Sequence, residues 1–199
     1  MYLLPSLFPS LIWKIKTEEK ILYLTFDDGP TPEITEWVLG QLKQYNAKAT
    51  FFCIGKNVAA YPEIYKRIIS EGHLIGNHTY NHLNAWKTSK NDYIKDVEKA
   101  APLIESNLFR PPYGKITPAL IQSLKSNYKV IMWDVLSYDF DVNKDESYCM
   151  NKVIRSAKKG SIVVFHDSVK AMPRLKETLP IILSYLTDAG YQFKTIPVK

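Results

Sequence analysis

Short apolar runs alternate with longer amphipathic segments along this chain from Ile21 to its end. The short runs are rich in β-branched and aromatic residues, which favour strands, whereas the longer segments repeat apolar residues at helical spacing. Such alternation is typical of proteins in which helices connect parallel strands. The pattern therefore predicts an α/β fold built on a parallel sheet.

The expected elements fill the chain without a linker, a repeat or a low-complexity segment. We expect strands at residues 21–26, 49–54, 73–76, 108–110, 129–133, 161–165 and 191–196. We expect helices at residues 32–45, 59–70, 92–106, 118–126, 146–159 and 175–189. Gly72, Gly160 and Gly190 each follow an expected helix, where a left-handed backbone conformation is favoured. A chain of 199 residues suits one hydrophobic core, so residues 21–199 are predicted to form a single domain.

The first 20 residues precede the alternating pattern. Residues 1–13 are apolar, but Pro5 and Pro9 interrupt them and no basic residue stands before them. This composition favours neither a signal peptide nor a membrane-spanning helix. We expect residues 1–20 to pack on the domain as an apolar N-terminal extension.

The net charge of +6 raises the question of an anionic partner. The 26 lysines and arginines are spread along the whole chain, and the longest basic runs are the pairs Lys66-Arg67 and Lys158-Lys159. Nothing resembles a nucleic-acid-binding arm. We therefore expect a solvated basic surface and no nucleic-acid partner.

Polar residues suited to catalysis follow the expected strands. They gather in five segments, at residues 25–30, 77–82, 110–114, 134–139 and 166–168. The carboxyl ends of the strands in a parallel barrel meet at one face, which is where active sites are built. The sequence thus predicts that five separate segments converge on one site.

Asp27 and Asp28 stand side by side at the end of the first strand, and Gly29 and Pro30 then force a turn. Two adjacent carboxylates repel each other unless a cation or a shared proton offsets their charge. A bound metal ion would provide that cation. The alternative interpretation is an ordinary Asp-Gly turn with solvated acids.

His78 and His82 are four residues apart, so on a helical turn their imidazoles would lie on one face and reach the same ion. Two histidines and one aspartate make the three-ligand set of a catalytic zinc site, which leaves a position open for water. The alternative is a surface helix with two unrelated histidines, since the glutamate of a zinc-protease helix is absent.

These motifs resemble the polysaccharide deacetylases, also known as the NodB homology domain or carbohydrate esterase family 4. The resemblance rests on Thr25-Phe-Asp-Asp-Gly-Pro30, His78-Thr-Tyr-Asn-His82 and Arg110-Pro-Pro-Tyr-Gly114, and it extends over about residues 21–192. It implies a distorted (β/α) barrel of about seven parallel strands, similar to a TIM barrel. It also implies a hydrolase that removes N-acetyl groups from glycans containing N-acetylglucosamine, such as peptidoglycan or chitin-type oligomers.

The resemblance implies a metal site and a base. Asp28, His78 and His82 would hold a divalent ion, with zinc expected first and cobalt, nickel or manganese as alternatives. Asp27 would take the proton from a metal-activated water. The backbone N–H of Tyr113 would donate to the oxyanion that forms on the acetyl group.

The same resemblance implies an acid. His166 ends the run Ile162-Val-Val-Phe-His166 and would protonate the amine leaving group, a task suited to the ordinary pKa of histidine. Asp139 would raise the pKa of that histidine, and Arg110 would orient the base. A histidine that caps a strand and ordinary ion-pair residues are the alternative interpretations.

Three residues depart from the common pattern of these deacetylases. Phe140 replaces the usual tryptophan, Leu136 stands where many members have a polar residue, and Val163 stands in the place of a leucine that lines the acetyl pocket. Together with Tyr113, these three residues are expected to contact the substrate. The departures leave the catalytic residues in place, so they bear on substrate identity.

Two other functions remain open. The first is a catalytically silent binding module, which the presence of both Asp27 and His166 disfavours. The second is a hydrolase of small amides or of O-acetyl esters on the same fold. The expected partner is an acetylated glycan and the expected state is a monomer. Such substrates suggest the cell envelope or secretion, but no export signal is visible, so we assign no location.

Overall fold

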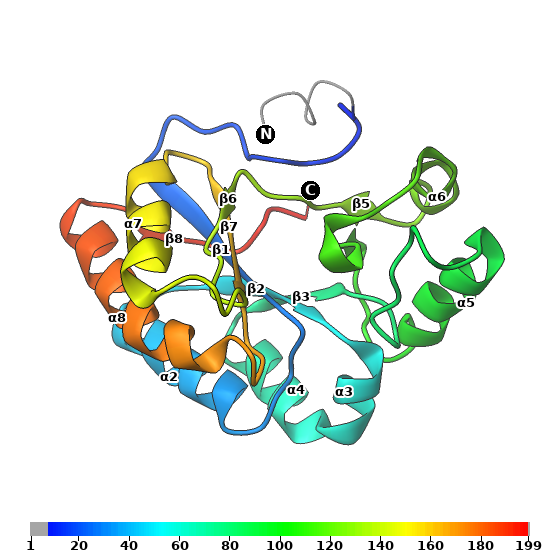
Figure 1. The fold of residues 1–199 in the computed structure, drawn as a ribbon, viewed down its shortest axis with the longest axis horizontal. Coiled ribbons are helices and arrows are strands. Elements are labelled where there is room, and N and C mark those ends of the chain that lie inside the picture. The colour runs from blue at the N-terminus through cyan, green and yellow to red at the C-terminus, as the bar shows by residue number, and fades with distance from the viewer. Residues whose placement is uncertain (1–7, 199) are drawn as a thin grey trace.

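A single curled parallel sheet forms the centre of the protein. The computed structural model describes residues 8–198. Seven strands hydrogen-bond in the order β5-β4-β3-β2-β1-β7-β6, and β8 pairs with the start of β1. The strands are β1 (Ile21–Asp27), β2 (Ala49–Cys53), β3 (Leu74–Asn77), β4 (Leu108–Phe109), β5 (Lys129–Val130), β6 (Val135–Leu136), β7 (Ile162–His166) and β8 (Gln192–Phe193). The seven-stranded sheet curls into an open half-barrel, which confirms the predicted α/β fold (Figure 1).

Helices cover the convex side of this sheet, on the left, below and on the right in Figure 1. They are α2 (Ile34–Gln44), α3 (Gly55–Ala60), α4 (Pro62–Ser70), α5 (Lys90–Ala100), α6 (Pro118–Leu124), α7 (Glu146–Ser156) and α8 (Met172–Asp188), with a short 3-10 turn, η1 (Pro112–Gly114). Ser89, Thr117 and Asp145 cap α5, α6 and α7 by accepting a hydrogen bond from a free backbone N–H of the first turn. No helix within residues 8–198 is both long and apolar enough to cross a membrane.

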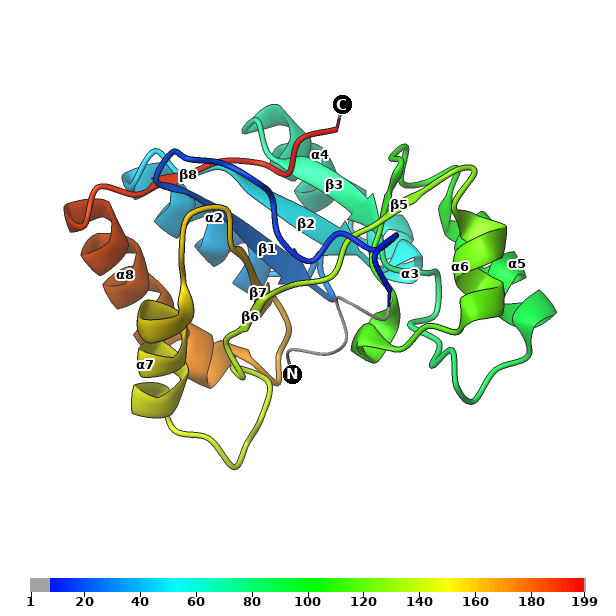
Figure 2. The ribbon, with the colours of Figure 1, turned by 90° about the horizontal axis from the view of Figure 1, so that it is seen from above.

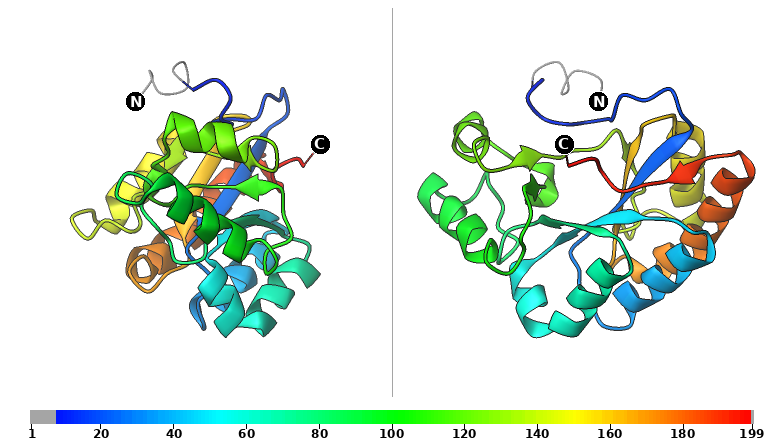
Figure 3. Two further views of the ribbon diagram at one scale, coloured as in Figure 1. Left: turned by 90° about the vertical axis from the view of Figure 1, so that its right-hand side faces the viewer. Right: turned by 180° about the vertical axis from the view of Figure 1, so that it is seen from behind.

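The described part of the N-terminal segment lies across the open side of the half-barrel (Figure 2 and Figure 3). Ile12 donates a backbone hydrogen bond to Val130 at 2.9 Å and accepts one from Met132 at 2.7 Å. Ile15 donates to the carbonyl of Gly160 at 2.9 Å, just before β7. The segment thus connects the β5 side of the sheet with the β7 side. Residues 1–7 of the expected extension lie outside the described residues.

The structure corrects several expected boundaries. The helix expected at residues 59–70 is two helices, because Pro62 cannot donate to the preceding turn and starts α4 instead. The helix expected at 92–106 ends at Ala100, two residues before Pro102. Strand β6 was not predicted, and the strand expected at 129–133 is only two residues long. Gly72, Gly160 and Gly190 have the expected positive φ angles of 79°, 79° and 82°.

The register of the sheet brings the strand-end residues together. Asp27 is the partner of His166 on β7 and of Phe52 on β2. Asn77, which precedes the first histidine of the pair, is the partner of Phe109, which precedes Arg110. Neighbouring strands therefore end at the same level, and the residues that follow them share one edge of the sheet.

Candidate active site

A pocket of about 320 Å³ opens at the carboxyl ends of the strands. This volume lies in the range of small-molecule sites. It is lined by Asp27, Asp28, His78, His82, Tyr113, Gly114, Trp133, Leu136, Phe140, Val164, His166 and Lys170. All five predicted segments contribute a residue or its immediate neighbour, so the expected convergence on one face is confirmed.

Asp28, His78 and His82 form a cluster suited to a metal ion. Their potential ligand atoms all lie within 4.8 Å of one another, and Asp28 Oδ1 is 3.2 Å from His82 Nε2 and 3.8 Å from His78 Nε2. Burial opposes ionisation of Asp28, but the hydrogen bond with His82 and the nearby histidines hold its pKa below the ordinary value. The carboxylate is therefore ionised, as a metal ligand must be.

His78 is held in the form that can bind a metal. Its Nδ1 lies 2.7 Å from the carbonyl oxygen of Arg110, which can only accept, so Nδ1 carries the proton. The lone pair is then on Nε2, the nitrogen that faces Asp28. Burial lowers the pKa of His78 to about 4, which keeps the ring neutral at physiological pH. This arrangement is typical of metal-ligating histidines, whose second nitrogen is fixed by a hydrogen bond.

The two histidines lie on a loop and not on a helix, which corrects the geometry expected from their spacing. Thr79 and His82 have positive φ angles of 64° and 59°, so the chain turns back between them. Asn77 Oδ1 accepts the N–H of Thr79 at 2.8 Å, and Thr79 Oγ1 accepts the N–H of Leu83 at 3.3 Å. Asp96 on α5 accepts two further backbone N–H groups of this loop. These hydrogen bonds bring both rings to one side.

Asp27 is paired with a fully buried arginine. Arg110 Nη1 donates to Asp27 Oδ1 at 2.7 Å and to Thr25 Oγ1 at 2.6 Å. Its other nitrogens donate to the carbonyl groups of Ile131 and Met132 at 3.2 and 3.1 Å. The guanidinium is thus fixed on three sides, and it holds the carboxylate of Asp27 in one orientation at the edge of the pocket.

His166 and Asp139 form a second buried pair. Asp139 Oδ1 lies 2.8 Å from His166 Nδ1, and its other oxygen accepts the backbone N–H of His166 at 2.7 Å. Burial opposes protonation of the ring, but the charge of Asp139 and this hydrogen bond raise the pKa of His166 to about 9. The imidazole therefore carries a proton at neutral pH.

Tyr113 lies on the metal side of the pocket, within η1. Its φ angle is 61°, and its ring packs against that of His82 with centroids 4.5 Å apart. Its hydroxyl is 3.2 Å from His82 Nδ1. Among the residues that the structure describes, the backbone N–H of Tyr113 has no hydrogen-bond acceptor. This N–H is therefore free to donate to a bound molecule.

Known proteins are similar to this chain in sequence. The family model of the polysaccharide deacetylases matches residues 14–130, more than half of the chain. The chain belongs to the polysaccharide deacetylase family. A peptidoglycan-N-acetylglucosamine deacetylase of Bacillus cereus is 38% identical over 191 residues, which cover 92% of this chain and 90% of the relative. The peptidoglycan-N-acetylmuramic acid deacetylase PdaC of Bacillus subtilis is 32% identical over 92% of this chain and 39% of its own length.

A solved structure has the same fold. The Bc1960 peptidoglycan N-acetylglucosamine deacetylase, in complex with a benzamide compound, superposes with a TM-score of 0.89 at 32% identity, covering 94% of this chain and 91% of that chain. This likeness extends the match beyond residue 130, where the family model ends. The similarity therefore includes the part of the fold that follows β5.

The structure changes one expected substrate contact. Leu136, Phe140 and Tyr113 line the pocket as expected. Val163 does not: it is fully buried in the core between the sheet and the helices, and Val164 lines the pocket instead. Side chains alternate along a strand, so the residue that shares a face with His166 is the one two positions before it. That spacing was visible in the sequence and identifies Val164.

Asp167 is a site residue that the sequence did not predict. It is fully buried, and its two oxygens accept the N–H of Gly29 at 3.0 Å and the hydroxyl of Thr35 at 2.5 Å. Its own N–H donates to the carbonyl of Asp27 at 3.1 Å. Asp167 thereby ties the end of β7 to the turn that carries Asp28. The only signal in the sequence is an acid directly after a strand-ending histidine.

A second unpredicted contact fixes the same turn from the other side. Asn57 Nδ2, on α3, donates to the carbonyl of Asp28 at 2.7 Å. The N–H of Ile54 donates to the carbonyl of Gly29 at 2.9 Å. Asp28 has a φ angle of 85°, which is unusual for a residue with a side chain. Hydrogen bonds from several elements therefore keep this ligand in its turned conformation.

Proposed function

We propose that this protein is a metal-dependent deacetylase that removes N-acetyl groups from a glycan containing N-acetylglucosamine. One observation carries the proposal. A three-ligand cluster, a carboxylate fixed by a buried arginine and a protonated histidine fixed by a buried carboxylate line one pocket. Acetamide hydrolysis needs these parts, because water must be deprotonated and the amine must be protonated.

The donor set fits a divalent ion, with zinc as our first choice. Two imidazoles and one carboxylate make up a three-protein-ligand catalytic zinc site. A bound zinc ion would polarise the acetyl carbonyl and lower the pKa of water toward 7. Asp28, His78 and His82 would hold it through the atoms that face one another in the pocket.

Asp27 then acts as the general base. Its carboxylate lines the pocket next to the triad, and Arg110 leaves it no freedom to turn away. The Tyr113 N–H donates to the carbonyl oxygen as negative charge develops there, a contact of a kind worth about 3 kcal/mol in other enzymes.

His166 supplies the proton to the leaving nitrogen. The Asp139 carboxylate keeps the ring protonated below pH 9, so the acid is ready at neutral pH. The same carboxylate fixes Nδ1, which leaves Nε2 to face the substrate. The base and the acid are the last residues of the neighbouring strands β1 and β7, which places them within reach of one acetamido group.

The relatives support a glycan substrate, since their names record peptidoglycan deacetylation. The fold alone is also compatible with a catalytically silent binding module. A mutant of BA3943, described as a CE4 family pseudoenzyme with restored enzymatic activity, has a TM-score of 0.78 at 25% identity, covering 94% of this chain and 70% of that chain. The complete set of Asp27, Asp28, His78, His82 and His166 favours an active enzyme here.

Acetate release from peptidoglycan fragments and from acetylated chito-oligosaccharides tests the proposal. We expect release with added zinc or cobalt, loss of release after chelation and recovery when the metal returns. Asp28→Ala is the matched control, because it removes one ligand and should abolish both metal retention and turnover. Release that is indifferent to chelation would overturn the metal assignment, and release from neither glycan would overturn the substrate assignment.

A further inference from the structure

The charged side chains that line the pocket have opposite charges beside them, with one exception. The proposed base is paired with Arg110 and the proposed acid with Asp139, while the third carboxylate belongs to the metal triad. Lys170 also lines the pocket, and it has no carboxylate within ion-pair distance among the residues that the structure describes. The pocket therefore carries one cation that no carboxylate among residues 8–198 pairs with.

The main chain fixes the position of this lysine. Arg174, on α8, donates to the carbonyl of Lys170 at 2.7 Å and to the carbonyl of Asp139 at 2.6 Å. The backbone of Lys170 is thus held in place four residues after His166. Its ammonium lies 5.9 Å from the ring of Phe140, whose ring is in turn 4.9 Å from that of His166. The cation is held close to the acid side of the pocket.

The surrounding wall gives Lys170 no competing partner. Leu136, Phe140 and Val164 make this side of the pocket apolar. The lysine itself is exposed, so it stays available to a bound molecule. A neutral sugar offers this cation only hydroxyl groups, whereas a carboxylate on the substrate would meet an unpaired charge at short range.

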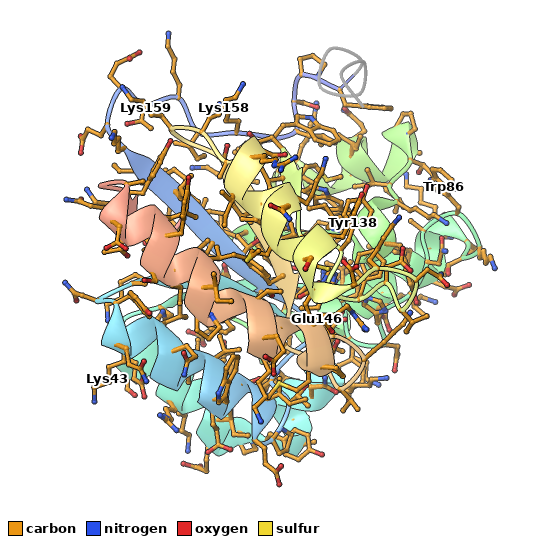
Figure 4. All side chains as sticks on the ribbon, turned by 60° about the vertical axis from the view of Figure 1, so that its left-hand side comes forward. Lys43, Trp86, Tyr138, Glu146, Lys158 and Lys159 are labelled. Carbon is orange, nitrogen blue, oxygen red and sulfur yellow. The ribbon has the colours of Figure 1, made fainter. Side chains whose placement is uncertain are left out.

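A second lysine follows the pocket-lining residues of η1. Lys115 comes directly after Tyr113 and Gly114, which line the pocket, and its ammonium lies 4.8 Å from the ring of Trp86. Trp86 is 67% exposed and projects from the molecule in Figure 4. Like Lys170, Lys115 has no acidic partner among residues 8–198. Each of these two lysines thus lies near an aromatic ring.

We propose that Lys170 is a specificity-determining residue that binds a carboxylate of the substrate, at or next to the sugar that loses its acetyl group. The substrate class is then an anionic N-acetylated glycan, such as a strand with lactyl or peptide carboxylates, in preference to a neutral chitin-type oligomer. This inference rests on the proposed function, and it names which glycan that function acts on.

Two glycans of equal length test the effect of a substrate carboxylate apart from the effect of chain length. One is chitotetraose, and the other is a tetrasaccharide of alternating N-acetylglucosamine and N-acetylmuramic acid without peptide. We expect the zinc-loaded protein to have the higher kcat/KM on the second glycan. Lys170→Gln should lower this preference about five-fold, mainly through KM, as expected for a rim charge. Lys170→Arg should keep the preference.

Lys43→Gln is the matched control, because it removes the same charge from α2, far from Trp86 in Figure 4. It should leave the preference unchanged. Raising the ionic strength from 0.02 to 0.5 M should reduce the preference of the unaltered protein, since salt screens exposed charges. Melting temperatures of all variants identify any loss of folding.

An unaltered protein with no preference, or a Lys170→Gln variant with the same preference, would overturn the inference. Calorimetric binding of both glycans to the zinc-loaded protein gives an independent reading. If neither glycan releases acetate, the proposed function fails, and the binding preference still decides the role of Lys170. Preferential binding that Lys170→Gln abolishes would support that role, and equal binding would contradict it.

Discussion

The two sides of the pocket differ in how they are built. The metal wall, formed by Asp28, His78 and His82, is polar and is fixed by hydrogen bonds from several elements. The acid wall, formed by Leu136, Phe140, Val164 and His166, is mostly apolar and has a free lysine at its rim.

This difference indicates that the metal wall serves the reaction and that the apolar part of the acid wall serves substrate selection. A metal site tolerates little displacement, so its ligands need a dense network of support. The acid wall fixes only His166 in this way, through Asp139. Its other side chains line the pocket and have no part in the proposed reaction. We therefore expect changes on the metal wall to abolish turnover, and changes to the apolar side chains of the acid wall to alter which substrates are used.

The largest effect is expected at Asp27, the proposed base beside the metal wall. Asp27→Asn should retain zinc and lower kcat about 1000-fold, because the amide cannot take a proton. The change also leaves the buried Arg110 without its counter-charge, so we expect a loss of about 3 kcal/mol in unfolding free energy. Acetate release, zinc content and chemical denaturation measure these three quantities. A folded, zinc-loaded Asn variant with normal turnover would remove Asp27 from the mechanism.

The next effect tests the one fixed pair of the acid wall. Asp139→Asn removes the charge that raises the pKa of His166 to about 9. The ring then loses its proton at a lower pH, toward the ordinary value of about 6.5. We expect the alkaline limb of the kcat profile to move to lower pH, and turnover at pH 8 to fall about 30-fold. The pH dependence of acetate release measures this shift, and an unmoved limb would contradict the acid role.

A smaller effect tests the support of the metal wall. Asp167→Ala removes the two oxygens that accept hydrogen bonds from the Gly29 N–H and the Thr35 hydroxyl. Both contacts are then lost, and the turn that carries Asp28 loosens. We expect zinc affinity to fall about ten-fold, with kcat at saturating zinc changed much less.

Competition with a chromophoric chelator measures the zinc affinity of this variant. Asp188→Ala, at the exposed end of α8, is the matched control and should bind zinc normally. Equal zinc affinity in Asp167→Ala and the unaltered protein would show that Asp167 supports the fold without supporting the ligand.

The smallest effect tests the two adjacent valines of β7. Val164→Leu should narrow the pocket and lower kcat/KM for N-propionyl relative to N-acetyl substrates about five-fold, less than a methylene is worth in a tight pocket. Val163→Ala should leave this ratio unchanged and lower the unfolding free energy by about 2 kcal/mol, because it opens a cavity in the core. If Val163→Ala changed this ratio and Val164→Leu did not, Val163 would be the residue that lines the pocket.

Much of this protein follows from its sequence. The alternation of strands and helices requires a parallel sheet, and in such a sheet the carboxyl ends of the strands share one edge. Asp27, Asp28 and His166 stand at strand ends, so their convergence could be predicted without knowing any contact. The chemistry of these residue types then indicated a metal, a base and an acid.

Only the tertiary structure decided how these residues are held. The spacing of His78 and His82 suggested a helix, but the side chains of Asn77 and Asp96 accept hydrogen bonds from backbone N–H groups and impose a loop. Asp167 reaches the Asp28 turn across 138 residues of chain, a contact that no local pattern encodes. Local sequence sets which side chains end the strands, because that depends on neighbours along the chain. Sheet register and long-range hydrogen bonds set their partners, because these depend on residues far apart in sequence.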